Sequence, residues 1–335
     1  MTGRSISAET APRAEARAAP AAGRLEALDL ARFVMALFVV GAHGRMFIDI
    51  SYPLYFYSYV GGFMRIIIPM FLMISGYFFA VQVKRGVGRW AKRLLILHLI
   101  WSTIYIGAWM PPGSFSALKA AFWYFFGAGH LWFMPSLIGG GLMLYWLRDW
   151  PTGRLLALAA GLYATGGALQ YAMDATVDFA TVAHHNALYA VPRNFLFYGF
   201  PFVALGHVMA RPGVLERVQG RLGWPLFAAL IAALFVEITV KYLGFSHEAV
   251  FETNLAMFPL AAVVFAWLLS LRGVRAAPWM APMSAGVYFV HALVLMALEP
   301  VAGLTPTLLT LVAVVISVAA AWVLMKLNGR PIPLV

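Results

Sequence analysis

The sequence predicts an all-α fold, a polytopic integral membrane helix bundle of about ten transmembrane helices with the N and C termini in the cytoplasm. Three observations support this prediction. The chain of 335 residues is 62% hydrophobic and only 11% charged, which is too apolar for a soluble domain to cover with polar surface. Ten apolar runs able to span a bilayer follow one another along the chain. Basic residues gather in alternate loops, which sets the orientation.

The ten apolar runs use nearly all of the chain, so a second folded domain has no room. Short loops separate the runs, and some of them span a bilayer only if they are tilted. The runs lie at residues 27–47, 57–83, 94–110, 130–147, 155–172, 194–210, 223–242, 253–271, 279–298 and 304–326.

Alternating the loops between the two sides of the membrane places most basic residues on one side. The positive-inside rule makes that side cytoplasmic. The outer loops and outer helix ends then hold only Arg45, Arg65, Lys119, Arg193 and Lys241. Topology therefore explains most of the formal net charge of +11, and a nucleic-acid partner is not expected.

Residues 1–24 contain four arginines among Ala, Pro, Ser and Glu, with no apolar core like that of a signal peptide. We expect a disordered cytoplasmic tail there, followed by one transmembrane domain over residues 25–330. Cysteine is absent from the chain, which excludes disulfides, thiolate metal sites and a cysteine-bound acyl intermediate. No metal site is expected.

The segment 112–130 is apolar but too short to span the bilayer before the next run begins. We expect an outer interfacial or re-entrant segment there. The two halves of the chain show no convincing repeat, so an inverted-repeat transporter has no direct sequence support.

The first apolar run carries charged residues on one helical stripe. His43 follows Arg32 by eleven residues, which returns to nearly the same helix face about 16 Å further along the axis. Asp29 lies one turn below Arg32 and can pair with it. Ionisable groups inside a membrane need a partner or a water-filled cavity. The spacing has a second explanation, in which Asp29 and Arg32 form an ion pair at the helix end and His43 is a hydrogen-bonded histidine at the membrane interface.

The densest charge cluster is the basic loop at residues 84–93. It can act as a topology determinant that touches anionic lipid. It can also bind a polyanionic cytoplasmic ligand, because Arg89 and Arg93 lie one helical turn apart, with Lys92 beside them.

Further polar candidates lie towards the outer face. Pro69 and the Ser75-Gly76 pair in the second run indicate a kink and a close helix approach. Glu237 lies well inside the seventh run and is expected to reach a cation such as Arg65 or Arg193. His291 lies in the middle of the ninth run, where a lone histidine is often only a hydrogen-bonded packing residue. The polar and aromatic candidates for a site here are Arg65, His130, Trp132, Arg193, Glu237 and His291.

Together these residues resemble the membrane acyltransferase-3 family, the bacterial integral membrane O-acyltransferases that decorate surface glycans. The resemblance covers residues 25–295. Its most specific element is the first-helix pattern of Asp29, Arg32, ten residues and His43. Supporting elements follow in family order at 69–79, in the basic loop, at 130–133, at 193–206 and at 288–291.

The resemblance implies an acyl-CoA cosubstrate, with acetyl as the default acyl group, and a glycan or glycolipid acceptor at the outer side of the bacterial inner membrane. His43 would be the base, with Arg32 and Asp29 completing the catalytic set. The site candidates named above, from Arg65 to His291, would bind the acceptor or stabilise the oxyanion. The CoA phosphates would rest on Arg89, Lys92, Arg93 and Arg32. Whether Lys92 or Arg93 fills the second position of the basic element stays open.

Some family members carry an appended extracytoplasmic hydrolase-like domain, and we expect none here. Acceptor chemistry is then expected to finish in the membrane domain or with a separate acyl-handling partner. A homo-oligomer is a further open alternative. The runner-up function is a transporter or flippase for a lipid-linked glycan, with Arg65, Arg193 and Glu237 as a binding or proton-relay site. Turnover of the thioester separates the two functions, because a flippase does not consume acyl-CoA.

Overall fold

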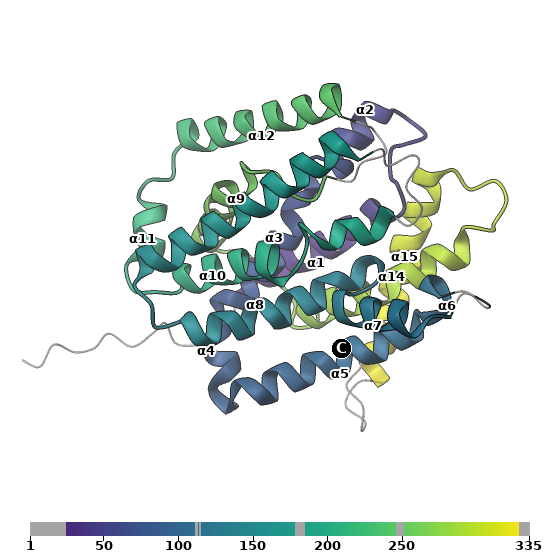
Figure 1. Ribbon diagram of the computed structural model, residues 1–335, viewed down its shortest axis with the longest axis horizontal. Coiled ribbons are helices and arrows are strands. Elements are labelled where there is room, and N and C mark those ends of the chain that lie inside the picture. The colour runs from purple at the N-terminus through teal and green to yellow at the C-terminus, as the bar shows by residue number, and fades with distance from the viewer. Residues whose placement is uncertain (1–24, 111–112, 114, 178–184, 246–250, 328–335) are drawn as a thin grey trace, which may run out of the picture.

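The computed structural model describes residues 25–110, 113, 115–177, 185–245 and 251–327, and these residues form helices without strands. The predicted tail at 1–24 and the last residues of the predicted domain lie outside this description. The all-α prediction is therefore confirmed for the described part of the chain. Figure 1 shows the helices running across a single bundle, with α12 and α5 at opposite edges of the view.

Each predicted apolar run coincides with at least one helix. The order is α1 (Glu26–His43), α2 (Tyr52–Tyr55), a π-helical turn η1 (Phe56–Val60), η2 (Phe63–Ile66), α3 (Ile67–Tyr77), α4 (Phe79–Gln82), η3 (Val83–Arg85), α5 (Val87–Ile104), α6 (Ile106–Trp109), α7 (Ala117–Phe126), η4 (Gly129–Trp132), α8 (Phe133–Leu147) and α9 (Thr152–Thr176). Then come η5 (His185–Ala190), a π-helical turn η6 (Phe195–Gly199), α10 (Phe200–Met209), α11 (Val214–Gln219), α12 (Trp224–Gly244), α13 (Met257–Ser270), α14 (Met280–Leu298) and α15 (Pro306–Leu327).

Five continuous segments of the described chain are long and apolar enough to cross a membrane: Tyr52–Tyr77, Thr152–Thr176, Trp224–Gly244, Met280–Leu298 and Pro306–Leu327. Other helices are shorter or carry more charge, as α1 and α5 do. Large apolar side chains are nevertheless exposed around the bundle, such as Trp146 at 80% and Trp224 at 82%. Such exposure fits a lipid-facing surface.

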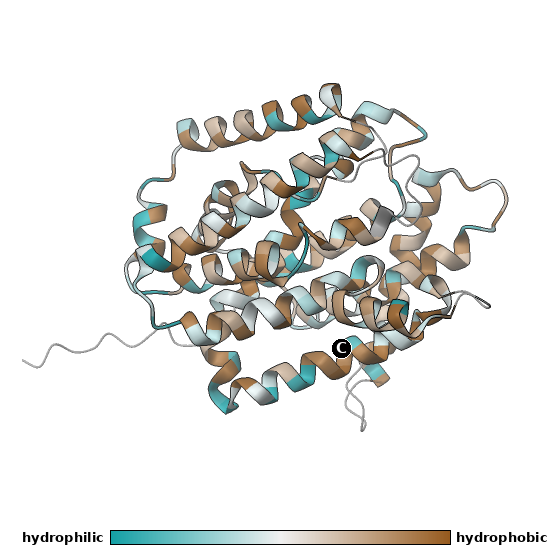
Figure 2. Cartoon of the chain, viewed as in Figure 1, coloured by the Kyte–Doolittle hydropathy of each residue, from teal (hydrophilic) through white to brown (hydrophobic). Residues whose placement is uncertain are grey.

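The basic loops gather at one end of the bundle. Figure 2 shows hydrophilic residues at the start of α5 and on α11, while the long helices are mainly apolar. The start of α1 lies at this end too, because the backbone N–H of Ala276 donates to Glu26 Oε2 at 2.9 Å, beside Arg275. The short helices α2 and α6 lie at the opposite end in Figure 1. We call these ends the basic end and the far end.

Glycines allow the central helices α3 and α10 to pack backbone against backbone. A Cβ on Gly76 would lie 2.0 Å from the carbonyl oxygen of Val203, and a Cβ on Gly206 would lie 2.0 Å from that of Met73. The two contacts are reciprocal, so neither glycine tolerates a side chain without movement of the backbone. The close approach predicted from Ser75-Gly76 is therefore confirmed.

Candidate active site

A cavity of about 750 Å³ opens in the far half of the bundle. Its walls come from the end of α1, from residues 55–68, from α5 to α7, from η4 and from α14, together with parts of the segments around residues 193 and 252. Five predicted site residues therefore meet, although they are far apart in sequence. They are His43, Arg65, His130, Trp132 and Arg193. We call this space the histidine cavity.

Three histidine rings cluster beside this cavity. The ring centroids lie 5.1 Å apart for His43 and His291, 6.0 Å apart for His43 and His130, and 4.7 Å apart for His130 and His291. His43 is exposed and lines the cavity, whereas His130 and His291 are buried. His43 is therefore the histidine of this cluster that is most accessible to a substrate.

His291 lies behind His43 in a defined tautomer. Its Nδ1 is 2.7 Å from the carbonyl oxygen of Tyr288 and 3.1 Å from that of Val287. A carbonyl oxygen only accepts, so Nδ1 must carry the hydrogen, and a neutral ring then offers a lone pair at Nε2. That Nε2 is buried without a hydrogen-bond partner among the described residues, as is Nε2 of His130.

A group of three charged residues also lies in the wall of the cavity. Arg65 Nη1 donates to Glu252 Oε2 at 2.8 Å, and Arg193 Nη1 donates to Glu252 Oε1 at 3.1 Å. The side chain of Glu252 is 6% exposed, and those of Arg65 and Arg193 are 21% and 14% exposed. The two arginines thus share one carboxylate in a largely buried setting.

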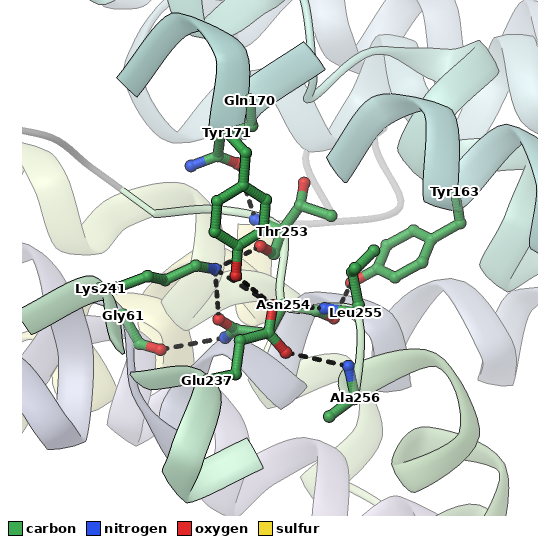
Figure 3. Close-up of polar contacts among 10 residues, drawn as sticks. All are labelled: Gly61, Tyr163, Gln170, Tyr171, Glu237, Lys241, Thr253, Asn254, Leu255 and Ala256. Atoms are coloured by element: carbon green, nitrogen blue, oxygen red, sulfur yellow. Dashed lines mark hydrogen bonds and ion pairs between the residues drawn. The ribbon is translucent and has the colours of Figure 1, made fainter. Parts of the chain in front are cut away.

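The segment that carries Glu252 is irregular and buried, with Phe251, Thr253 and Asn254 at most 1% exposed. Non-helical backbone at membrane depth needs partners from the protein itself. Figure 3 shows how polar side chains of α9 and α12 supply them. Lys241 Nζ donates to Thr253 O and to Asn254 Oδ1, both at 2.6 Å, and Thr253 N donates to Gln170 Oε1 at 2.9 Å.

Glu237 also holds this segment and does not line the cavity. We call Lys241, Gln170 and Glu237, the side chains that hold residues 253–256, the anchor. It accepts from Tyr171 Oη at 2.8 Å and from the backbone N–H groups of Leu255 and Ala256 at 2.7 and 3.0 Å, and it lies 3.5 Å from Lys241 Nζ. The prediction that Glu237 pairs with Arg65 or Arg193 is wrong. Glu252 takes that place, and Glu237 instead caps the backbone at the start of α13.

Local structure explains how two of the cavity residues are presented. Asn194 Oδ1 accepts from the N–H groups of Leu196 and Phe197 at 2.8 and 3.0 Å, which fixes the start of η6 and the preceding Arg193. Arg65 donates from Nε to Val60 O at 2.9 Å. That carbonyl ends η1, so a π-helical turn adjoins each arginine, and such turns often occur at functional sites.

His43 ends α1 and is followed by a strained turn. Arg45 and Phe47 have φ of 56° and 79°, a region that non-glycine residues seldom adopt. The turn is held to the start of α15, because Thr307 donates from its backbone N to Asp49 Oδ1 at 3.1 Å and accepts from Phe47 N at 2.9 Å. These bonds stabilise the end of α1 beside the cavity.

The remaining predicted residues lie outside the cavity wall. Arg89, Lys92 and Arg93 are exposed at the start of α5, and they make no hydrogen bond or ion pair within the described chain. Arg89 and the cavity residue Tyr105 are about 24 Å apart along α5 at 1.5 Å per residue. Arg32 is half-buried on α1, and its Nε has no hydrogen-bond partner among the described residues. Asp29 lies in the first turn of the same helix.

Sequence reasoning missed Glu252 as well as two tyrosines of the cavity. Tyr105 donates to Phe289 O at 2.7 Å and Tyr288 donates to His130 O at 2.8 Å, so both hold backbone that carries the histidines. The position of Glu252 at the head of an apolar run was a usable signal, because the outer arginines needed a carboxylate. Within the described chain, no group of three or more His, Asp or Glu residues is arranged to hold a metal ion.

Comparison with known families agrees with the first-helix pattern. A family model described as an acyltransferase domain, Acyl_transf_3, matches residues 25–326. No curated protein and no solved structure matches the chain. The matched range covers nearly all of the described bundle, including the basic loop and the histidine cavity, and the chain therefore belongs to the membrane acyltransferase-3 family.

Proposed function

We propose that the protein is a membrane O-acyltransferase that moves an acyl group, by default acetyl, from cytoplasmic acyl-CoA to a hydroxyl of an extracytoplasmic or lipid-linked glycan. The observation that carries the proposal is the histidine cavity: an exposed His43 stands in front of two buried histidines, at the end of the bundle opposite the basic loops. Bacterial inner-membrane localisation and cytoplasmic termini belong to this proposal.

The donor would enter from the basic end. Exposed Arg89, Lys92 and Arg93 are suited to the phosphates of CoA because guanidinium and ammonium groups form charge-assisted hydrogen bonds with them. Arg32 lies on α1 eleven residues before His43, and its buried Nε without a hydrogen-bond partner among the described residues would contact the donor between the basic loop and the cavity. The distance of about 24 Å along α5 would be spanned by the extended arm of the cofactor, which brings the thioester to His43.

The chemistry is then a direct transfer. A ring nitrogen of His43 takes the proton of the acceptor hydroxyl while its oxygen attacks the thioester carbonyl. The tetrahedral intermediate collapses, the C–S bond breaks, and the proton passes from His43 to the departing thiolate. Ester and free CoA are the products. No covalent acyl-protein intermediate is needed, in keeping with the absence of cysteine.

The two histidines behind His43 suit different roles. In its neutral tautomer His291 offers only a lone pair towards its unpartnered side, so it is suited to accept a hydrogen bond and to orient its neighbour. His130 also has an unpartnered Nε2 and is the better candidate to donate to the oxyanion, together with Trp132.

The flippase alternative loses one of its supporting features. Its relay would require Arg65, Arg193 and Glu237 in one site, whereas Glu237 is held by Lys241, Tyr171 and the backbone at 255–256. Glu252 still pairs with the arginines, so the test must separate the two functions directly.

Oriented proteoliposomes with labelled acetyl-CoA on one side and a glycan acceptor on the other provide that test. Transfer predicts labelled ester at the far side and stoichiometric free CoA. A flippase would move unmodified acceptor and release no CoA. Product formed only when donor and acceptor share one compartment would refute the through-membrane route and retain the acyltransferase class.

A further inference from the structure

The wall of the histidine cavity is rich in cationic side chains. Among the described residues, its lining contains Arg65, Lys119 and Arg193 together with one carboxylate, Glu252. Lys119 is half-buried, and the side chains of Arg65 and Arg193 are 21% and 14% exposed. Cationic side chains around a partly dry cavity attract a ligand of opposite sign.

Arg65 retains hydrogen-bonding capacity for such a partner. A guanidinium has five N–H groups, and Arg65 uses one at Nε for Val60 O and one at Nη1 for Glu252. Its side chain lines the cavity and is 21% exposed. The planar fork of the guanidinium matches a carboxylate or a phosphate better than a neutral hydroxyl.

The charged group is also held in place before any ligand binds. Glu252 fixes both arginines, and its own backbone neighbours are pinned by Lys241, Gln170 and Glu237 (Figure 3). The guanidinium of Arg193 lies 5.7 Å from the ring of Trp132 and 5.3 Å from that of Tyr189. Preorganised donors in a partly dry site bind an anion more strongly than the same groups in water.

We propose that the acceptor is itself anionic, and that Arg65 and Arg193 bind a carboxylate or phosphate carried by the sugar or by its linkage while His43 activates a hydroxyl. The proposal rests on the acyltransferase function proposed above and names the class of its second substrate. Two sources share this chemistry: an acidic sugar in the glycan, and the phosphate that links a sugar to a lipid.

Equilibrium binding tests the proposal without turnover. The full-length protein in nanodiscs of neutral lipid is titrated calorimetrically with methyl glucoside, methyl glucuronide and glucose 1-phosphate. Saturating CoA is present throughout, so that the basic loop at the other end is occupied. We expect at least one anionic probe to bind about 10- to 100-fold more tightly than the neutral glucoside. The tighter of the two anions identifies the source.

Matched variants locate the effect. Arg65→Gln should abolish the preference for the anion, and Arg65→Lys, which keeps the charge but loses the fork, should retain part of it. The control is Arg45→Gln, which removes an exposed arginine near the far end that does not line the cavity, and the preference should persist. Glu252→Gln removes the competing carboxylate and should strengthen the preference.

Equal binding of the three probes, or no binding of any, overturns the proposal. An equal loss of affinity for neutral and anionic probes in Arg65→Lys also overturns the proposal, because it would mean that Arg65 has only a structural role. Failure of the acyltransferase function gives a different result, namely intact anion preference without CoA release from acyl-CoA in the presence of a bound acceptor. Acyl transfer without anion preference refutes only the anionic acceptor.

Discussion

Replacement of His43 by alanine is the sharpest test of the proposed chemistry. General base catalysis contributes roughly 10²- to 10⁴-fold to a rate, equivalent to about 2.7–5.5 kcal/mol of transition-state stabilisation. The side chain is exposed to the histidine cavity, so its removal leaves no buried void. We therefore expect acyl transfer to fall by two to four orders of magnitude, while the free energy of unfolding changes by about 0.5 kcal/mol or less.

The assay measures CoA release and ester formation by purified protein in nanodiscs, at equal amounts of folded protein. Thermal unfolding of the same samples gives the stability. His98→Ala is the matched control, because His98 is 1% exposed and donates from Nε2 to Tyr124 O at 2.8 Å, away from the histidine cluster. It should lose about 1–3 kcal/mol of stability and keep its activity per folded molecule. A His43→Ala protein within threefold of the native rate would refute the assignment of the base.

Three further predictions concern the donor site and the fold. Arg89→Ala combined with Arg93→Ala should raise the KM for acyl-CoA more than it lowers kcat, because phosphate binding that is equal in the ground state and the transition state is lost. A normal KM in correctly oriented protein would mean that this loop only sets the membrane topology. Gly76→Ala should destabilise the protein by about 1–3 kcal/mol in thermal unfolding, since its Cβ would lie 2.0 Å from a backbone oxygen of α10. Gly88→Ala is the control and should leave the stability unchanged, because the space around Gly88 is open. Lys241→Met should cost about 3–5 kcal/mol because it leaves buried Glu237 without its cation, and an unchanged unfolding temperature would contradict the role of the anchor.

The sequence was sufficient to name several residues that meet in the folded chain, but not how they pair. Apolar periodicity located the helices, and the cost of intramembrane charge singled out His43, Arg65 and Arg193, which line one cavity in the folded chain. Pairing depends on where an irregular segment lies in three dimensions. Periodicity carries no such information, and Glu237 was therefore assigned the place that Glu252 takes.

The helix assignment had a similar limit at the start of α13. The apolar run begins at residue 253, yet the helix begins at Met257, because residues 251–254 form buried irregular backbone and residues 255–256 form a turn. Glu252, Thr253 and Asn254 are polar, but composition alone does not show that such a segment is buried or which side chains satisfy it. The indirect signal in the sequence was the presence of Lys241 and Gln170 inside apolar runs, because such polar side chains need a partner. In the structure both hold the segment and are at most 1% exposed.

Two groups of charged residues in the described bundle, around Lys241 and around Glu252, have different structural roles, and this separation explains why so apolar a chain retains them. Lys241 and Glu237 satisfy the backbone of a segment that could not otherwise be buried. That segment holds Glu252, which in turn fixes Arg65 and Arg193 at the wall of the cavity. Replacing the first group by apolar residues would remove charge from the membrane but release the segment. The cost of burying the anchor is therefore offset by a preorganised site, and we expect anchor variants to lose acceptor affinity together with stability.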